Sequence, residues 1–266
     1  MRILIVSDLH VEYSEYNRYA VSMIGELAID ECVDFIGICG DISGDYMQFD
    51  DALDELSTYG IPILFVPGNH DIWTTVDDTF SMEKLDWMRD YDGAHCLMRS
   101  PMVVDDIAIV GTMGWYDYSF ADPELEYDDD VYARKYCSAT GREWMDGRFA
   151  RFGMSDKDVA DMFNRELESH LKEVNDCRVK IVLTHFAPFL PVQKRAFPKP
   201  SYFNAYGGND GLGRVMLKYG VDISVSGHLH KNFDMMHRGI RCYQTGIDYL
   251  HKPIYSLVDR YIIIDV

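Results

Sequence analysis

The sequence predicts an α/β fold built around parallel strands. Short, continuous apolar runs alternate with segments of helical periodicity, and a turn with polar, metal-binding side chains follows most of these runs. Alternation of this kind is typical of parallel sheets joined by crossover helices. Uninterrupted apolar runs are typical of strands buried on both faces. Because ligands bind at the carboxyl ends of the strands in such sheets, we expect the polar turns to meet at one edge.

The N-terminal part of the chain shows the clearest alternation. Its predicted elements are, in order, the strand 3–6, the helix 19–29, the strand 35–39, the helix 49–56 and the strand 63–66. In the first helix, Val21, Ile24 and Ala28 recur at the spacing of one helical face. This order predicts three parallel strands with the two helices as crossovers.

The C-terminal part of the chain predicts further strands with tighter connections. Asp105 and Asp106 separate two apolar runs, which predicts a hairpin. Residues 204–208 are interpreted as a loop that enters a helix before Val221. The strands expected in this part are 102–104, 107–110, 179–183, 221–225, 233–236, 240–243 and 261–264.

Residues 115–175 interrupt this rhythm. The stretch from Trp115 to Gly153 is rich in aromatic and acidic side chains, and a helix with Ser155 as its N-cap should follow it. We expect 115–175 to be an insertion, or cap, beside the polar turns. Because those turns come from both ends of the chain, we expect one domain that spans 1–266.

The chain is strongly acidic. Its 25 lysines and arginines against 44 aspartates and glutamates give a formal net charge of −19. Such a surface opposes broad contact with a nucleic-acid backbone and with an anionic membrane, so neither is an expected partner. It does not exclude a phosphate substrate, because bound divalent cations reverse the field locally. Hydrophobic residues make up 47% of the chain, which supports a large folded core.

The cysteines and the apolar runs bear on the compartment. The six cysteines include no C-x-x-C pair, and Cys39 lies in an apolar run where a buried thiol is ordinary. The first apolar run leads straight into Asp8, and no apolar run approaches the length that spans a membrane. We therefore expect a cytoplasmic protein, whose oligomeric state the sequence does not predict.

Five polar segments follow the predicted strands, and together they indicate a metal site. The segments are Asp8-Leu9-His10, Gly40-Asp41, Gly68-Asn69-His70-Asp71, Thr184-His185 and Gly227-His228-Leu229-His230. Each alone has an ordinary explanation as a turn, a cap or a structural histidine. Their order and their common position after strands indicate enough oxygen and nitrogen ligands for two metal ions. This mixture of carboxylates and imidazoles suits Mn, Fe or Zn better than Ca.

These segments resemble the five signature blocks of the calcineurin-like metallophosphoesterase superfamily, which are D-x-H, G-D, G-N-H-[DE], H and G-H-x-H. The second block, Gly40-Asp41-Ile42-Ser43-Gly44, lacks the further acidic residue that some members carry. A weaker similarity, at Trp115-Tyr116-Asp117-Tyr118 and Trp144, is to a bacterial branch of these phosphoesterases. The resemblance implies a four-layer sandwich in which two packed mixed β-sheets are flanked by helices.

The resemblance also implies a role for each polar side chain. Two divalent metal ions would be held by Asp8, His10 and His230, by Asn69, His185 and His228, and by Asp41 as the bridge between them. His70 would be the general acid at the leaving-group oxygen, and Asp71 would orient it. A hydroxide that bridges the two metals would be the nucleophile. A positioned general acid contributes about 10²–10⁴-fold.

The polar segments do not define the substrate. Specificity should reside in the insertion and in the segment after His185, which is interpreted as a loop. Two basic clusters are candidates to bind a second phosphate or a nucleotide: Lys194, Arg195 and Lys199 form one, and Arg148 and Arg151 form the other. Five aromatic residues are candidates to stack on a base, namely Tyr116, Tyr118, Trp144, Tyr202 and Phe203. The alternatives are a solvated loop for the basic residues, which is slightly favoured, and packing beneath a cap for the aromatic ones.

The leading hypothesis is a metal-dependent phosphoesterase that hydrolyses a small phosphodiester or phosphomonoester, with a nucleotide as one candidate substrate. A nuclease is the alternative enzyme, and the lack of a basic groove opposes it. An inactive scaffold of the same fold is the alternative from another class, and the complete ligand set opposes it.

Overall fold

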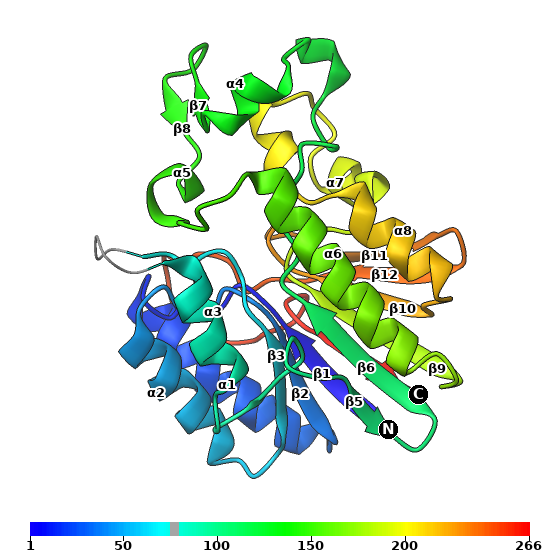
Figure 1. Cartoon of the computed structure of the whole chain (residues 1–266). Coiled ribbons are helices and arrows are strands. Elements are labelled where there is room, and N and C mark those ends of the chain that lie inside the picture. Colours follow the sequence, from blue (N-terminus) through cyan, green and yellow to red (C-terminus); the bar gives the residue numbers. More distant parts are fainter. Residues whose placement is uncertain (75–79) are drawn as a thin grey trace.

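The computed structural model describes residues 1–74 and 80–266 and contains two large β-sheets that pack face to face (Figure 1). The first sheet has the order β13–β1–β2–β3–β4 and contains β1 (Arg2–Val6), β2 (Phe35–Cys39), β3 (Ile63–Val66), β4 (His95–Cys96) and β13 (Ile262–Asp265). The second has the order β11–β12–β10–β9–β6–β5 and contains β5 (Met102–Val104), β6 (Ile107–Thr112), β9 (Val179–Thr184), β10 (Ile223–Ser226), β11 (Phe233–His237) and β12 (Ile240–Gln244).

Both sheets are mixed, with parallel strands in the centre. In the first sheet β1 to β4 are parallel and β13 is antiparallel to β1. In the second sheet β6, β9, β10 and β12 are parallel, whereas β5 and β11 pair antiparallel at the two edges. The predicted parallel strands and the predicted hairpin at Asp105 are therefore confirmed, and Asp105 has a φ of +53°.

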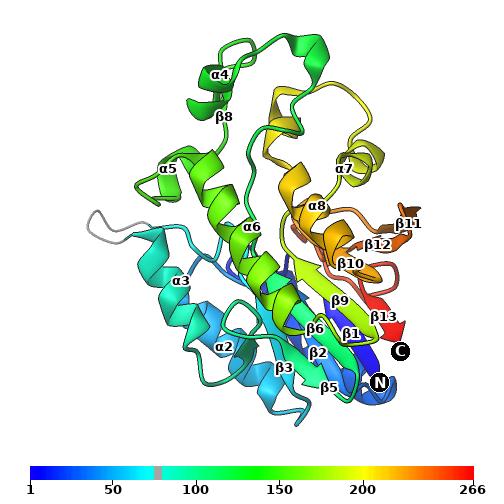
Figure 2. The same cartoon turned by 45° about the vertical axis from the view of Figure 1, so that its right-hand side comes forward.

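Helices cover the outer face of each sheet, so the chain has four layers. The first sheet is covered by α1 (Glu15–Asp30), α2 (Tyr46–Ser57) and α3 (Ser81–Arg89), and the second by α6 (Asp156–Glu173) and α8 (Asp210–Lys218). Figure 2 shows α6 and α8 beside each other outside the second sheet. The expected fold of two packed mixed sheets flanked by helices is confirmed.

Successive side chains of a strand point to opposite faces of its sheet, and in both sheets both faces are buried. Leu4 and Val6 of β1 pack with the helices, whereas Ile5 of the same strand packs against the second sheet. The contact between the sheets is close at Gly37, where a Cβ would lie 3.2 Å from both Ile5 Cγ1 and Leu183 Cδ1. This packing brings the carboxyl ends of parallel strands from both sheets together.

The segment after His185 differs from its interpretation as a loop. It contains the helix α7 (Leu190–Ala196), whose first turn holds Pro191. Proline fits the first turn of a helix because its fixed φ suits that position and no N–H is needed there. The two prolines that follow the helix, Pro198 and Pro200, gave the segment its loop-like composition. Residues 204–208, also interpreted as a loop, overlap the short 3₁₀ helix η2 (Tyr202–Tyr206).

The expected insertion, residues 115–175, falls into two parts. Its second part is α6, which begins after the predicted N-cap Ser155 and packs on β6 in the outer helical layer. Its first part contains the short elements η1 (Pro123–Leu125), α4 (Asp129–Ala133), β7 (Tyr136–Cys137), β8 (Arg142–Glu143) and α5 (Asp146–Phe149). These short elements stand at the top of Figure 1, above the edge where the sheets' central strands end. The single domain and the cap remain predictions.

Two expectations from composition concern the cysteines and the membrane. All six cysteines are free thiols, and Cys39 is buried as expected. Within residues 1–74 and 80–266, none of the helices is both long enough and apolar enough to cross a bilayer. The compartment stays a prediction.

The packing between the sheets predicts the cost of truncating Leu183. Leu183 is fully buried between the two sheets, so Leu183→Ala should leave a cavity and lower the free energy of unfolding by about 2–5 kcal/mol. Urea denaturation followed by circular dichroism measures this change. The control is Val103→Ala on the edge strand β5, where the side chain is 46% exposed and the expected change is about 0.5 kcal/mol or less. Equal losses in the two variants would contradict the assignment of Leu183 to the interface.

Candidate metal centre

The predicted metal ligands all follow the carboxyl ends of parallel strands. In the first sheet Asp8 and His10 follow β1, Asp41 follows β2 and Asn69 follows β3; in the second, His185 follows β9, and His228 and His230 follow β10. Because the two sheets pack face to face, these seven side chains from both ends of the chain meet at one edge. The sequence prediction that the polar turns meet is confirmed.

Several of these residues have a left-handed backbone conformation, which sets the direction of their side chains. The φ values are 55° at Asp8, 44° at His10, 54° at Asp41, 68° at His228 and 50° at His230. Positive φ is uncommon for residues other than glycine, and each case costs about 1–3 kcal/mol. Such strain persists only where the surrounding structure enforces it, and it clusters at functional sites.

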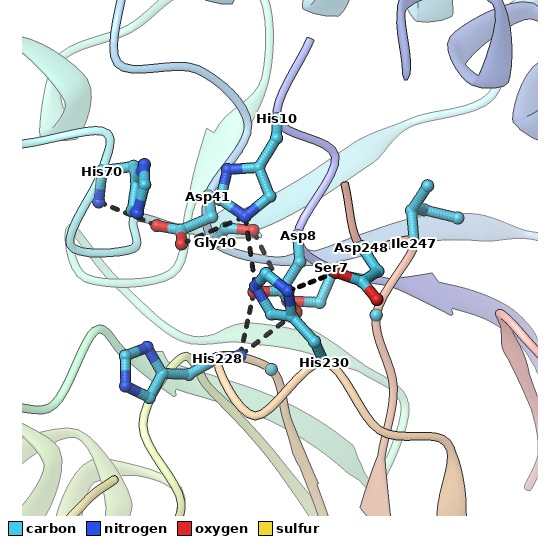
Figure 3. Close-up of polar contacts among 12 residues, drawn as sticks. Ser7, Asp8, His10, Gly40, Asp41, His70, His228, His230, Ile247 and Asp248 are labelled. Carbon is cyan, nitrogen blue, oxygen red and sulfur yellow. Dashed lines mark hydrogen bonds and ion pairs between the residues drawn. The ribbon is translucent and has the colours of Figure 1, made fainter. Parts of the chain in front are cut away.

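The first group of donor atoms comes from Asp8, His10, Asp41 and His230, which each offer one atom within 4.8 Å of the others. His10 Nε2 lies 3.2 Å from His230 Nε2, and His230 Nε2 lies 3.3 Å from Asp8 Oδ1. Figure 3 shows these side chains pointing toward one another. The group matches the set expected to hold the first metal.

The second group comes from Asp41, His185 and His228, again within 4.8 Å of one another. His185 Nε2 lies 3.4 Å from Asp41 Oδ2 and 3.2 Å from His228 Nδ1. Asn69 completes the group, because its Oδ1 lies 2.9 Å from the same His185 nitrogen. Asp41 thus belongs to both groups, as expected of a bridging carboxylate.

Most of these imidazoles are held through the ring nitrogen that points away from the centre. His185 Nδ1 lies 2.8 Å from the carbonyl oxygen of Cys39, and His228 Nε2 lies 3.1 Å from that of Tyr206. His230 Nδ1 lies 2.7 Å from Asp248 Oδ1. A partner of this kind fixes the ring and leaves the inner nitrogen free to bind a metal.

The buried charges fit cations at this position. Asp8 and Asp41 are at most 1% exposed. Burial alone would raise the pKa of the Asp41 carboxyl, but the charge and the hydrogen bond of His185 lower it well below its ordinary value. Opposing burial, the carboxylates Asp41 and Asp8 raise the pKa of His185 to about 9. The buried carboxylates favour positive charge at this site. Together with its oxygen and nitrogen donors, this makes the site suitable for divalent metal ions.

His70 lies beside the two groups, against the ring of His10. Its ring stacks on Trp73 with 3.7 Å between centroids, and its Nε2 lies 3.4 Å from the Tyr249 hydroxyl. Its Nδ1 lies 3.9 Å from Glu12 Oε1. Burial lowers the pKa of His70 to about 4. These three neighbours hold a neutral imidazole at the edge of the centre in the free protein.

Asp71 forms no hydrogen bond with the imidazole that it was expected to orient. Its two carboxylate oxygens accept hydrogen bonds from the backbone N–H groups of Ser43 and Gly68, at 2.8 and 2.7 Å. Ser43 and Gly68 belong to the turns after β2 and β3, so Asp71 ties together the turns that carry Asp41 and Asn69. The physical reason is reach, since a short carboxylate beside a tight turn satisfies the turn's own backbone donors first.

A buried carboxylate that sequence reasoning missed connects the insertion to the centre. Asp146, the first residue of α5, is fully buried. Its Oδ1 accepts from Asn69 Nδ2 at 2.9 Å and from Trp73 Nε1 at 2.7 Å. Its Oδ2 accepts from Trp144 Nε1 at 2.7 Å and from the Tyr116 hydroxyl at 3.1 Å. Asp146 therefore fixes the Asn69 amide with its oxygen toward His185, and no local sequence signal marks a contact between residues this far apart.

A cleft of about 810 Å³ opens onto the centre. Among the candidate substrate residues, Trp144, Lys199 and Phe203 line it, whereas Tyr116, Arg148, Lys194 and Arg195 do not. Tyr116 is buried beneath it on Asp146, and Arg148 pairs with Glu143 at 2.6 Å. Lys194 and Arg195 lie exposed in α7, with the Arg195 guanidinium 5.0 Å from the ring centroid of Phe233. Their role in substrate binding stays a prediction that no contact with the cleft supports.

Comparison with known proteins identifies similar sequences and folds. A model of the family described as calcineurin-like phosphoesterase matches residues 1–232. Phosphopantetheinyl hydrolase (PptH) from Mycobacterium tuberculosis is 19% identical with a TM-score of 0.77, over 93% of this chain and 89% of that one. A dimetal phosphatase from Danio rerio is 12% identical with a TM-score of 0.58, over 92% and 87% of the two chains.

A third solved structure is GAP50, described as the anchor in the inner membrane complex of Plasmodium. It is 13% identical with a TM-score of 0.52, over 92% of this chain and 71% of that one. A search of curated proteins found no match. At these identities the likeness to solved structures concerns the fold alone.

Asp146→Asn should weaken metal binding without removing a metal ligand. The variant turns an amide N–H₂ toward donors that need an acceptor, so Asn69 loses its fixed orientation. Loss of such a supporting partner typically costs about 10–100-fold in metal affinity. Titration with Mn²⁺ or Zn²⁺ by calorimetry measures this.

The matched control is Asp156→Asn. Asp156 also accepts from a tryptophan indole and a tyrosine hydroxyl, those of Trp115 and Tyr118, but it contacts none of the candidate ligands. This variant should lose stability and keep its metal affinity. An equal loss of metal affinity in both variants would show that Asp146 acts through general stability only.

Proposed function

The chain belongs to the calcineurin-like phosphoesterase family, and we propose that it hydrolyses a small phosphoester at two divalent metal ions held by the residues from Asp8 to His230. The observation that carries the proposal is the pair of donor groups that share Asp41. A single structural metal would need only one of these groups. Two groups joined by one carboxylate would place two ions close together, and two-metal hydrolysis of phosphoesters depends on such closeness.

The seven ligand residues would hold the ions, with Asp8, His10 and His230 on one side of Asp41 and Asn69, His185 and His228 on the other. Two ions bound there would supply Lewis acidity that neutralises phosphate oxygens and lowers the pKa of an attacking water. The outer partners of the imidazoles keep the donors in place during turnover, which reduces the reorganisation that catalysis needs.

His70 would donate a proton to the leaving-group oxygen. Trp73 and Tyr249 hold its ring at the edge of the centre, within the cleft. Burial keeps the pKa of His70 at about 4 in the free protein, so the imidazole is neutral at pH 7. A bound phosphate anion attracts a proton to this ring and raises its pKa, which makes the proton available when substrate is present.

The fold alone does not establish hydrolysis, because the similar structure GAP50 is described as an anchor. A panel of substrates given to the metal-loaded protein tests the proposal. It contains p-nitrophenyl phosphate, bis(p-nitrophenyl) phosphate, a cyclic nucleotide, a dinucleotide and phosphopantetheine, the last prompted by the name of PptH. Turnover that chelation abolishes and Mn²⁺ restores supports the proposal, and the preferred compounds separate a phosphodiesterase from a phosphatase. Two bound metals with no turnover of any ester would contradict it and favour a scaffold. Preference for long DNA would favour a nuclease.

His70→Gln should keep the metals and lose most of the turnover. Glutamine has a similar size, but its amide does not release a proton near neutral pH, so kcat should fall by about 10²–10⁴-fold. Metal analysis of the variant, together with its kinetics, separates this effect from loss of the centre. His95→Gln is the control, because His95 contacts the carbonyl oxygen of Ser100, away from the cleft. Full activity in His70→Gln would remove His70 from the reaction.

A further inference from the structure

We propose that the substrate carries a second anionic group, separated from the phosphoester by a flat or apolar body, and that Arg142, Lys199 and Lys231 bind this group at the rim of the cleft. The inference rests on the proposed function, since the metal centre would hold the phosphoester. It names a substrate class that neither the family nor the metal ligands specify.

The cleft is larger than a phosphate alone needs. Its volume of about 810 Å³ lies within the range of sites that bury whole small molecules. One end of the cleft is the metal centre, with Asp41, Asn69, His70 and His228 among its lining residues. The rest is lined by the insertion, by α7 and the segment after it, and by residues of other turns that include Trp73, Lys231 and Tyr249. The cleft therefore has room for a body beyond the group that reacts.

Aromatic side chains line the part of the cleft next to the metal centre. The Trp144 ring lies 5.7 Å from the ring of His228, edge to face, and stacks on Tyr206 at 5.1 Å. Phe203 follows, 6.2 Å from Trp144. Asp146 fixes the indole of Trp144 and the amide of Asn69 together, so this wall has a set position relative to the metal centre. Such a wall suits the flat or apolar body of a substrate.

Cationic side chains lie next to the aromatic wall. The Arg142 guanidinium lies 5.7 Å from the ring centroid of Phe203, and Lys231 Nζ lies 5.7 Å from that of Phe197. Lys199 follows Phe197 by two residues and lines the same cleft. In the part of the chain that the structure describes, none of these three cations has a carboxylate partner within ion-pair distance. Their charges are available to a ligand.

The carboxylates of the cleft outside the metal groups each have a partner. Glu143 forms an ion pair with Arg148 at 2.6 Å, and Asp248 Oδ1 accepts a hydrogen bond from His230 Nδ1 at 2.7 Å. The outer cleft therefore has an excess of positive charge in a chain whose net charge is −19. A local excess of this kind attracts and retains an anion against the field of the whole protein. A compact, charged small molecule fits it better than a nucleic acid, which needs a longer basic surface.

Two thymidine compounds test the second anion by binding. Thymidine 3′,5′-bisphosphate and thymidine 5′-monophosphate differ by one phosphate only. Calorimetry with the metal-loaded and the metal-free protein should show the bisphosphate binding about tenfold tighter or more, and the preference should weaken as salt is added. The preference for the bisphosphate should fall by about 3- to 10-fold in each of the variants Arg142→Gln, Lys199→Gln and Lys231→Gln.

The controls remove cations outside the cleft. Lys172→Gln near the end of α6 and Arg238→Gln in the turn between β11 and β12 should leave the preference unchanged, because neither side chain lines the cleft. Equal affinity for the two compounds in the wild-type protein would overturn the inference. A preference that all five variants reduce alike would overturn it as well, because it would reflect net charge.

Turnover of a second matched pair separates this inference from the proposed function. The p-nitrophenyl ester of thymidine 5′-monophosphate and its 3′-phosphorylated form share the bond that breaks and the leaving group. A lower KM for the second ester, lost in the rim variants, supports the inference. Turnover of both esters with equal KM leaves the proposed function intact and overturns the inference. A rim-dependent preference in binding without turnover of either ester would support the inference and count against hydrolysis.

Discussion

Asp41 is the constraint on which the rest of the centre depends. Its carboxylate is almost fully buried at the end of β2, with Oδ2 3.6 Å from His10 Nε2 and 3.4 Å from His185 Nε2. His10 follows β1 of the first sheet and His185 follows β9 of the second. One carboxylate therefore lies beside candidate ligands from both sheets. Its position requires the two sheets to pack closely, and its charge requires cations beside it.

The surrounding structure compensates for the cost of this arrangement. Left-handed backbone at five ligand residues is strained, and it is held by tight turns and by hydrogen bonds such as those of Asp71. The outer partners Cys39, Tyr206 and Asp248 fix the imidazoles. Asp146 extends the same support to the insertion, which links the wall of the cleft to a metal ligand. The proposed metal site and the proposed substrate wall thus share one buried carboxylate.

The sequence predicted the parts of this structure that depend on local signals. Apolar runs ended by polar turns identified the central strands, and the turn residues of those strands identified all seven candidate ligands. It did not predict Asp146 or Tyr249, nor that Arg142 and Lys231 line the cleft, because these placements arise from contacts between residues far apart in the chain. Asn69 and Asp146, for example, are 77 positions apart. Of the basic cluster that stood out by composition, Lys199 lines the cleft, whereas Lys194 and Arg195 lie outside it. Composition marks charge, whereas placement in the fold decides what that charge can bind.

The most direct measurement of the central claim is the metal content of the purified protein beside that of Asp41→Asn. Because Asp41 belongs to both donor groups, the wild-type chain should bind two divalent ions, and the variant should lose affinity for both together. Elemental analysis and calorimetric titration with Mn²⁺ give the stoichiometry and the two affinities. A wild-type chain that binds one ion or none, or a variant that keeps two ions with unchanged affinity, would contradict the account.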